Sequence, residues 1–205
     1  MNYELRMIRF FDILFSVIGL IFLIPFFLII FLVIAIDSRG GVFFCQTRVG
    51  KNGKEFRLVK FRTMTAGADK QGGLTVGARD SRVTGVGYYL RKFKFDELPQ
   101  LINVLTGDMS LVGPRPEIRR YVDRYTPEQR IVLTVKPGIT DYASIEFMDE
   151  NELLGRSTDP EKSYIEEVMP AKIQYNLRYI KNQNLQEYFR ILALTFKGLF
   201  KKRDT

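Results

Sequence analysis

The sequence contains no histidine, no tryptophan and a single cysteine, Cys45. Histidine-based catalytic triads are therefore excluded, together with histidine-rich and cysteine-cluster metal sites and any disulfide within the chain. Acid–base or nucleophilic chemistry has to come from carboxylates, lysine, tyrosine or hydroxyl groups. The lone thiol also fits a reducing compartment.

The composition points to one catalytic unit with anionic partners. A single core is commonly built from about 100 to 200 residues, so a chain of 205 residues suits one domain with at most a small appendage. Lysine and arginine number 31 against 23 aspartates and glutamates, which gives a formal net charge of +8. Phosphates, nucleic acid and acidic lipid head groups all fit this charge, and the charge alone does not choose among them.

A long apolar segment lies near the N-terminus. Residues 13–36 include no charged side chain and are dominated by leucine, isoleucine, phenylalanine and valine. At a rise of about 1.5 Å per residue, a helix of this length could just span a bilayer core. The simplest interpretation is a transmembrane anchor. A cleaved signal peptide is disfavoured, because the apolar run is too long and no small-residue cleavage site follows it.

Two features of this segment favour a re-entrant helix over a spanning one. Pro25 lies near the middle of the run, where it removes a backbone hydrogen bond and clashes with the preceding turn, so we expect a bend there. Basic residues flank the run on both sides, and lysine and arginine tend to remain cytoplasmic. We therefore predict a re-entrant helix over residues 1–37 and a cytoplasmic, membrane-associated domain over residues 38–205. The flanking basic residues are Arg6, Arg9, Arg39, Arg48, Lys51 and Lys54.

The first part of residues 38–205 predicts a small β-hairpin and a loop. Phe43–Val49 and Glu55–Phe61 flank Asn52-Gly53, which is the strongest short signal for a hairpin turn. The stretch from Thr65 to Val86 is rich in glycine, threonine, aspartate and serine without clear periodicity, and it predicts a mobile loop. Loops of this length are often functional.

Helical periodicity returns twice beyond this loop. A helix is predicted from Asp96 to Leu105, with Pro99 in its first turn and Gly107 as its stop. Its apolar residues follow the i, i+3, i+4, i+7 spacing of a packed face; they are Leu98, Leu101, Ile102 and Leu105.

A second, longer helical pattern begins near Pro170, and its apolar stripe predicts a face that packs on the core. The alternative for its basic end, which comprises Lys197, Lys201, Lys202 and Arg203, is contact with an anionic membrane surface. The predicted fold class is thus α+β: a compact catalytic domain of helices and short strands, with an N-terminal re-entrant, Pro-broken membrane helix and interfacial amphipathic helices. The stripe consists of Ile173, Leu177, Ile180, Phe189, Leu192, Phe196 and Leu199.

The adjacent acids Asp96 and Glu97 are the candidates for chemistry. Viewed alone, two acids that open a helix are more often capping residues than a catalytic pair. The same position would also keep Asp96 ionised and suited to attack on phosphorus, as in aspartyl-phosphate chemistry. Such an attack needs cations around the transferred phosphoryl group, and several basic residues lie close in sequence. They are Arg91, Lys92 and Lys94 before the acids and Arg115 between two prolines. A divalent ion is also compatible, because Glu97 or Asp108 could supply the hard oxygen ligands it prefers.

Several short blocks together resemble the bacterial sugar transferase family, the monotopic phosphoglycosyl transferases. The blocks follow the order of the family, and the resemblance covers nearly the whole chain from the apolar N-terminus onward. They are Lys60-Phe61-Arg62-Thr63-Met64, Asp96-Glu97-Leu98-Pro99-Gln100 with the following Leu101 to Leu105, Gly107 to Pro116, and Lys136-Pro137-Gly138-Ile139-Thr140.

The resemblance implies a mechanism and a location. Asp96 would attack the β-phosphate of a UDP-sugar, release UMP and carry a covalent phospho-sugar that polyprenyl phosphate then accepts. Glu97 would complete the catalytic dyad, with Mg²⁺ required and Asp96 and Glu97 as its candidate ligands. The implied phosphate-binding residues are Lys60, Arg62, Arg91 and Arg115.

The resemblance also implies that the partners are a UDP-sugar, polyprenyl phosphate and membrane lipids, with no nucleic acid, and a homodimer is left open. The product would enter glycoconjugate synthesis at the cytoplasmic face of the bacterial inner membrane. The size implies the small form of the family, which consists of the catalytic domain alone.

Three positions depart from the family pattern. Ile24 precedes Pro25 where relatives often have serine, and Met148 stands where they have arginine. Asn176 takes the place of an acid that is common in the last helix. The last two changes fall on nucleotide or sugar contacts rather than on the acidic pair, and Arg156 is a candidate to compensate.

Two rival functions remain. A membrane-anchored basic domain that binds or scaffolds without catalysis explains the charge and the anchor, but not the acidic pair or Gly-Pro-Arg-Pro. It also predicts a basic stripe interleaved with stacking aromatics, which this sequence lacks. An enzyme that transfers only the sugar would release UDP, whereas transfer of a phospho-sugar releases UMP.

Overall fold

One long helix and a body of short elements make up the structure, a computed structural model that describes residues 3–68 and 80–200. The described elements comprise helices, two short two-stranded sheets and several tight turns, which confirms the predicted mixture of helices and short strands. Of the predicted loop from Thr65 to Val86, residues 69–79 lie outside the described residues. The rest of that stretch is partly ordered, since Val83 pairs with Met64 and a helix begins at Gly85.

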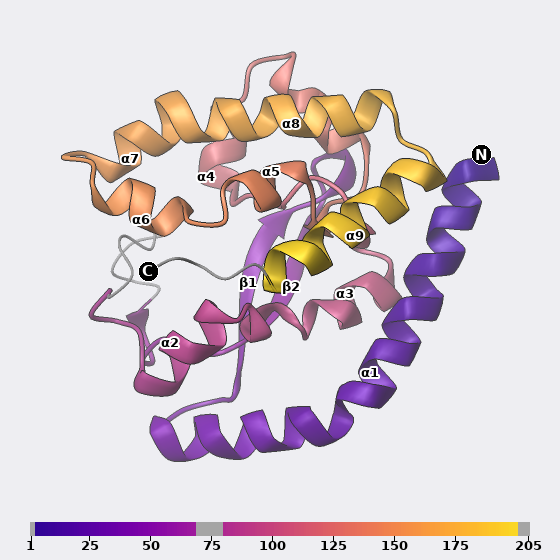
Figure 1. Ribbon diagram of the computed structural model, residues 1–205. Coiled ribbons are helices and arrows are strands. Elements are labelled where there is room, and N and C mark those ends of the chain that lie inside the picture. The colour runs from indigo at the N-terminus through magenta and orange to yellow at the C-terminus, as the bar shows by residue number, and fades with distance from the viewer. Residues whose placement is uncertain (1–2, 69–79, 201–205) are drawn as a thin grey trace.

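Helix α1 (Tyr3–Asp37) is 35 residues long and contains Pro25. Within the described residues it is the one helix long and apolar enough to cross a membrane. Figure 1 shows that α1 changes direction sharply partway along, so that its two halves follow two sides of the body. A proline inside a helix explains a bend of this kind, because it removes one hydrogen bond and crowds the preceding turn.

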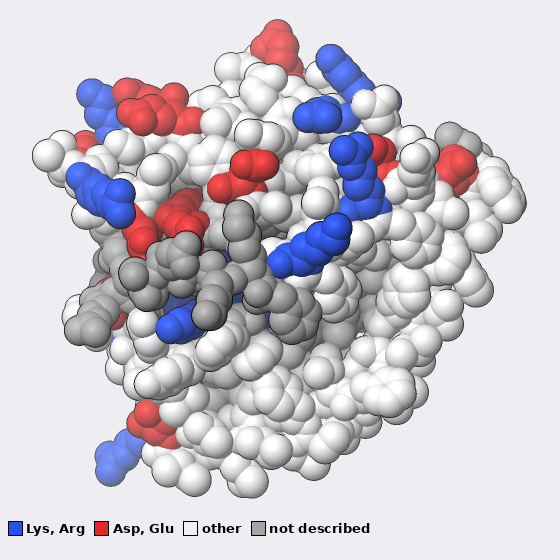
Figure 2. Space-filling view, in the orientation of Figure 1, with Lys and Arg blue, Asp and Glu red and all other residues white. Residues whose placement is uncertain are grey.

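The two ends of α1 include residues that are fully buried against the same body, while its middle is largely exposed. Ile8 lies in a buried cluster with Tyr188 and Ile191, whereas Ile34 packs with Phe61. None of the α1 residues from 17 to 29, all of them described, is fully buried. Figure 2 shows the corresponding surface as a broad area nearly free of charged side chains.

Two polar side chains near the start of α1 fasten it to the body. The Arg9 guanidinium donates hydrogen bonds to the carbonyls of Val104, at 2.6 Å, and Leu105, at 3.1 Å. These carbonyls belong to the last turn of a short helix, where they lack hydrogen-bond donors within the helix, and Arg9 supplies the missing donors. The buried carboxylate of Asp12 accepts hydrogen bonds from the Ser110 hydroxyl and the Tyr188 hydroxyl, each at 3.0 Å, and from the Leu111 amide at 2.9 Å.

The predicted hairpin is confirmed at both strands. Strands β1 (Phe43–Val49) and β2 (Glu55–Phe61) pair antiparallel with Phe43 opposite Phe61 and Val49 opposite Glu55. The connection contains the short 3-10 turn η1 (Lys51–Gly53). Asn52 and Gly53 both adopt positive φ, which these two residue types tolerate better than others.

A close crossing of two glycines fixes a small parallel sheet. Strand β3 (Ser110–Val112) pairs with β4 (Gly138–Thr140), and the backbones meet where Gly113 faces Gly138. A Cβ added to Gly138 would lie 2.1 Å from the Gly113 nitrogen, so no other residue fits there without a shift of backbone. The crossing brings Arg115 beside β4, where its amide donates to Asp141 Oδ2 at 3.3 Å.

The C-terminal third folds as two helices rather than the single long pattern predicted from Pro170. Helix α8 (Met169–Lys181) ends before the turn at 182–184, and α9 (Leu185–Phe200) runs in a new direction across the body (Figure 1). Asn184 explains the break, because its side chain accepts a hydrogen bond from the Glu187 amide at 2.9 Å and so caps α9. Phe196, predicted to pack, is 63% exposed.

The rest of the body consists of short helices and turns. They are α2 (Gly85–Lys92), η3 (Phe95–Glu97), α3 (Gln100–Thr106), α4 (Arg119–Val122), η4 (Gln129–Thr134), α5 (Tyr142–Glu146), α6 (Glu150–Gly155), α7 (Pro160–Ser163) and η5 (Tyr164–Val168).

Candidate active site

The acidic pair lies in a tight turn that precedes a helix. Lys94 adopts a left-handed conformation with φ 59°, and Asp96 and Glu97 follow in η3. Helix α3 begins only at Gln100, with Pro99 at the capping position and no side-chain cap. The predicted helix start at Asp96 was therefore too early, because the left-handed residue turns the chain into a tighter 3-10 geometry first. Neither acid caps α3, so capping does not account for them.

The face of this segment that points inward is the polar one. Buried residues recur with helical spacing, and they are Asp96, Pro99, Gln100, Asn103 and Val104. The apolar residues of the predicted pattern lie on another side of the segment. Leu101 packs toward Gly19 of α1, and Ile102 is 40% exposed. The stripe of α3 thus turns toward the apolar helix, which leaves polar side chains to face the body.

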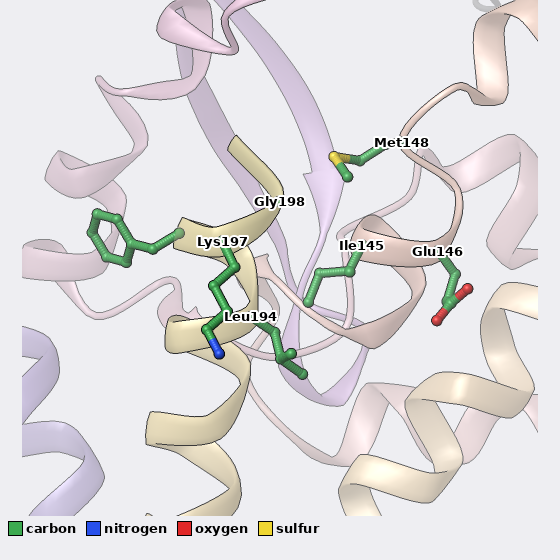
Figure 3. A pocket seen from close by; sticks show the side chains of 7 residues that line it. Ile145, Glu146, Met148, Leu194, Lys197 and Gly198 are labelled. Carbon is green, nitrogen blue, oxygen red and sulfur yellow. The ribbon is translucent and has the colours of Figure 1, made fainter. Parts of the chain in front are cut away.

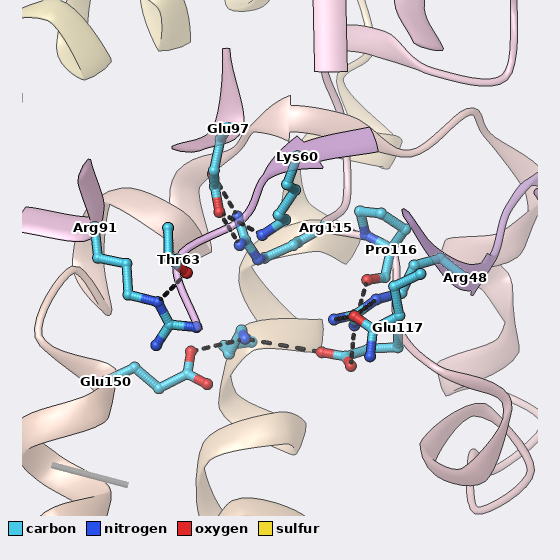
Figure 4. A network of polar contacts seen from close by, with 11 residues as sticks. Arg48, Lys60, Thr63, Arg91, Glu97, Arg115, Pro116, Glu117 and Glu150 are labelled. Atoms are coloured by element: carbon cyan, nitrogen blue, oxygen red, sulfur yellow. Dashed lines mark hydrogen bonds and ion pairs between the residues drawn. The ribbon is translucent and has the colours of Figure 1, made fainter. Parts of the chain in front are cut away.

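Glu97 is held between two cations. Figure 4 shows its carboxylate against Lys60 of β2 and Arg115, which approach from different parts of the chain. Lys60 Nζ lies 2.9 Å from Oε1, and Arg115 donates to Oε2 at 3.1 Å and also to Oε1. Burial alone would raise the pKa of Glu97, but the charges of Arg115 and Lys60 outweigh it and hold that pKa well below its usual value. Glu97 is therefore a permanent anion.

The pKa of Asp96 is shifted in the opposite direction, upward. Its side chain is buried, and Oδ1 has no hydrogen-bond partner among the described residues. Burial raises the pKa of Asp96, the neighbouring charge of Glu97 raises it further, and Lys60 and Arg91 oppose the rise. A carboxylate oxygen that is desolvated, unpaired and surrounded by cations is suited to nucleophilic attack on an anionic group.

Arg91 approaches the pair from α2. Its Nε donates to Thr63 Oγ1 at 2.9 Å, and α2 comes close enough to allow this because Gly87 lies against the Thr63 carbonyl. A Cβ on Gly87 would fall 2.0 Å from that oxygen. Burial lowers the pKa of Arg91, while the charge of Asp96 acts to raise it. Lys60, Arg91 and Arg115 thus all act on the acidic pair.

Arg62, another predicted phosphate ligand, lies at the exit of α1. Its guanidinium donates to the carbonyls of Arg39, at 2.6 Å, and Ser38, at 2.7 Å, and to the Ser38 hydroxyl at 3.0 Å. Across the described residues, no hydrogen bond or ion pair joins Arg62 to Asp96 or Glu97. The structure therefore gives Arg62 an observed role in holding the chain as it leaves α1.

A second buried network adjoins Arg115, and the sequence alone did not reveal it. Glu117 receives hydrogen bonds from the Tyr164 hydroxyl and, at 3.5 Å, from Arg48. Lys172 of α8 lies 3.9 Å from Glu117 and 2.9 Å from Glu150 (Figure 4). The one available signal was the position of Glu117 directly after Gly-Pro-Arg-Pro. Its partners come from segments far away in the chain.

The three departures from the family pattern occupy different environments. Ile24 is 55% exposed on the apolar helix. Met148 packs its sulfur and methyl group against Gly198 at the edge of an open hollow of about 760 Å³ (Figure 3). Asn176 is buried on α8, and its Oδ1 has no partner in the described part of the chain. Arg156 lines a separate hollow together with several acids: Glu146, Asp149, Glu150 and Glu152.

Of the two adjacent acids, one has a carboxylate available to bind a divalent ion. Across residues 3–68 and 80–200, no three histidine, cysteine, aspartate or glutamate side chains gather as a metal cluster. Magnesium often uses just one or two protein carboxylates and takes the rest of its ligands from substrate phosphates and water. The carboxylate of Asp96 is the one left for that role, because both oxygens of Glu97 already face cations.

Comparison with known proteins agrees with the geometry. UDP-N-acetylgalactosamine-undecaprenyl-phosphate N-acetylgalactosaminephosphotransferase of Aeromonas hydrophila is 39% identical over 177 residues, which cover 85% of this chain and 39% of that protein. Undecaprenyl-phosphate glucose phosphotransferase of Komagataeibacter xylinus is 36% identical over 200 residues, covering 92% of this chain and 35% of its own length.

A third relative, UDP-glucose:undecaprenyl-phosphate glucose-1-phosphate transferase of Escherichia coli (strain K12), is 36% identical over 199 residues, or 93% of this chain and 40% of that protein. The chain thus spans less than half the length of these three relatives. The family model described as bacterial sugar transferase matches residues 3–202. With nearly every residue of the site inside that match, the chain belongs to the bacterial sugar transferase family.

Proposed function

We propose that this protein transfers a sugar 1-phosphate from a UDP-sugar to undecaprenyl phosphate and releases UMP. The names of the relatives support the substrate classes and the reaction. The observation that carries the proposal is the state of Asp96, whose Oδ1 is buried and, within the described chain, unpaired, with the charges of Lys60, Arg91, Lys94 and Arg115 acting on the acidic pair. The product would serve the synthesis of an exopolysaccharide or another glycan.

In the first step, Asp96 Oδ1 attacks the β-phosphorus of the UDP-sugar. The bond between that phosphorus and the oxygen bridging to the α-phosphate breaks, and UMP leaves with the bridging oxygen and the bonding electron pair. The sugar phosphate stays on Asp96 as a mixed anhydride. Because negative charge meets negative charge, the step depends on positive groups beside the phosphoryl oxygens, which Lys60, Arg91 and Arg115 supply.

In the second step, a phosphate oxygen of undecaprenyl phosphate attacks the same phosphorus. The bond to Asp96 breaks, and the carboxylate is regenerated as the undecaprenyl diphosphate sugar forms. The burial of Asp96 serves this step, since a mixed anhydride that water could reach would hydrolyse before the lipid phosphate arrives.

Glu97 acts by holding cations rather than by attack. The bidentate pairing with Arg115 fixes a planar guanidinium that would otherwise sample many rotamers, and Lys60 is held by the same carboxylate. Magnesium, when bound, supplies further neutralisation of the diphosphate. Asp96 would hold the ion through the carboxylate oxygen that does not attack, because both oxygens of Glu97 already face cations.

The membrane arrangement proposed for this reaction is a re-entrant α1, with residues 38–205 at the cytoplasmic face of the inner membrane. Both ends of α1 pack on one body, which supports entry and return on the same side. A straight helix of 35 residues would be about 52 Å long and would carry its ends apart. The exposed aromatic side chains near α2 and on α9 support interfacial contact, and they include Tyr89, Phe93 and Phe196.

Replacement of the nucleophile tests the proposal. Purified wild-type protein in detergent should release UMP from at least one member of a panel of UDP-sugars when undecaprenyl phosphate is added. Asp96→Asn should lose this activity by a factor of about 10⁴ or more, because the amide cannot attack phosphorus. Asp123→Asn is the matched control, since this aspartate is exposed at the end of α4 and forms no side-chain hydrogen bond or ion pair among the described residues. Release of UDP would indicate transfer of the sugar alone, and release of no nucleotide would support a binding protein.

A further inference from the structure

Gln100 is a buried amide with an unused donor, located one turn from the proposed nucleophile. The side chain is 2% exposed, and its Nε2 has no hydrogen-bond partner among the residues described. Buried polar groups without partners are rare in folded proteins, so each one calls for an explanation. On a packed helix face, such a donor is available to a water molecule or to a group of a ligand.

The neighbouring amide of the same stripe shows that the face is well built. Asn103 lies three residues further along, and both ends of its amide are used. Its Oδ1 accepts from the Val59 amide at 3.0 Å, and its Nδ2 donates to the Arg57 carbonyl at 2.8 Å. The body therefore pairs both the oxygen and the nitrogen of one buried amide of α3, while the Nε2 of Gln100 has no partner among the described residues.

The unpaired atoms of Asp96 and Gln100 belong together. Both residues lie in the buried stripe, four positions apart, and Leu98 and Pro99 between them have right-handed helical φ and ψ, so the two side chains lie on the same side of the segment. One atom is an acceptor and the other a donor, yet the structure does not pair them. A group that fits between them has an electrophilic centre for Oδ1 and an oxygen that accepts from Nε2. A phosphoryl group has both.

We propose that Gln100 is a catalytic residue whose Nε2 donates a hydrogen bond to a non-bridging oxygen of the β-phosphoryl group while Asp96 attacks it. This role rests on the function proposed above. A neutral donor suits the position, because the amide N–H stabilises the phosphoryl oxygen without forming an ion pair with the attacking carboxylate.

The test compares the rate of adduct formation with two forms of the substrate. Full-length protein is mixed with a UDP-sugar labelled in the sugar, and labelled protein is measured in a single turnover. Gln100→Met keeps the length of the side chain and removes the donor, so the rate should fall about 100-fold, the usual effect of losing one such donor. The second substrate carries sulfur in place of one non-bridging β-oxygen, as separate diastereomers.

Sulfur is a poorer acceptor than oxygen, so one diastereomer should slow the wild type through its contact with Gln100. In Gln100→Met the same diastereomer should cause no additional slowing. Asn103→Leu is the control, because it removes a buried amide that is fully bonded within the protein. It should lower the melting temperature and keep the wild-type response to sulfur. Gln100→Glu, which keeps the shape of glutamine, removes the donor and adds a negative charge when the carboxyl is ionised, so its rate should fall at least as far as that of Gln100→Met.

Adduct formation in Gln100→Met at the wild-type rate, or an unchanged sulfur effect in both Gln100 variants, would overturn the role of Gln100. The function proposed for the chain would stand in either case, because the wild type would still be labelled at Asp96. A wild-type protein that accepts no label would overturn that function itself and this role with it.

Discussion

At the residue scale, adjacent carboxylates occupy opposite electrostatic states. Glu97 is an anion shared by Arg115 and Lys60, with its pKa well below the usual value. Burial raises the pKa of Asp96, and the charge of Glu97 adds to the effect. The same dipeptide thus supplies an anchor for cations and a desolvated nucleophile, and the difference comes from the partners that each side chain meets.

The raised pKa of Asp96 predicts where activity fails on acidification. Attack requires the ionised carboxylate, so adduct formation should be lost as the pH falls through a pKa above 3.8, the ordinary value for aspartate. Glu97→Gln removes a charge that raises this pKa and releases Lys60 and Arg115 to act on Asp96 alone. The acid limb of the variant should therefore shift to lower pH, although its maximal rate falls. An acid limb that stays in place or moves upward in single-turnover pH profiles would refute this electrostatic account.

At the element scale, α1 is held by one carboxylate that joins three parts of the chain. Asp12 receives hydrogen bonds from Ser110, Leu111 and Tyr188, and it is 1% exposed. Asp12→Ala should lower the free energy of unfolding by on the order of 3 kcal/mol, because buried donors are left without an acceptor. Denaturation in detergent micelles measures this change.

The matched control for that prediction lies at the other end of α1. Asp37 is exposed and accepts one long hydrogen bond, from the Val86 amide at 3.4 Å. Asp37→Ala should change the stability by less than about 0.5 kcal/mol, as is usual for surface sites. Equal losses in the two variants would mean that Asp12 does not hold α1 to the body.

How much of these elements the sequence predicts depends on whether the deciding contacts are local. The hairpin was predicted to the residue, since Asn52 and Gly53 favour the positive φ that they adopt. The spacing in α3 identified an apolar face but not its partner, because the helix it turns toward, α1, is distant in sequence. The division between α8 and α9 was missed, although the capping residue Asn184 was a signal for it.

The candidate site, too, could be predicted from the sequence only in part. The residue types in the motifs predicted Asp96, Glu97 and Arg115 as a group, and the ion pair of Glu97 with Arg115 brings two of them together. No spacing rule could place Gly113 against Gly138, the crossing that carries Arg115 to the site, because this contact joins segments distant in sequence. For the same reason, Lys172 and Glu117 became visible only in the folded chain.

At the scale of the whole molecule, the reaction needs a water-soluble nucleotide-sugar and a lipid phosphate at one place. A re-entrant α1 would hold the body against one face of the bilayer, with the polar stripe of α3 behind the helix that enters the lipid. The exposed, uncharged middle of α1 and the buried contacts of both its ends are the features that such an arrangement requires.

This topology predicts that both ends of α1 are labelled from the same side. Cys45 is exposed on β1 and serves as a natural reporter for the body. In a Cys45→Ser background, Tyr3→Cys should react with a membrane-impermeant thiol reagent from the cytoplasmic face, as Cys45 itself does, because residue 3 is 72% exposed next to a packed helix start. Ile24→Cys should be protected by lipid. Labelling of Tyr3→Cys from the opposite face would show that α1 spans the bilayer.

The proposed mechanism requires that Asp96 carries the transferred group as a covalent intermediate. Protein incubated with a UDP-sugar and no lipid acceptor can be quenched, digested and analysed by mass spectrometry of the peptide that contains Asp96. The account predicts that this peptide gains the mass of the sugar 1-phosphate less one water, and that undecaprenyl phosphate discharges the modification. UMP release with an unmodified Asp96 peptide, or with the adduct on another residue, would contradict it.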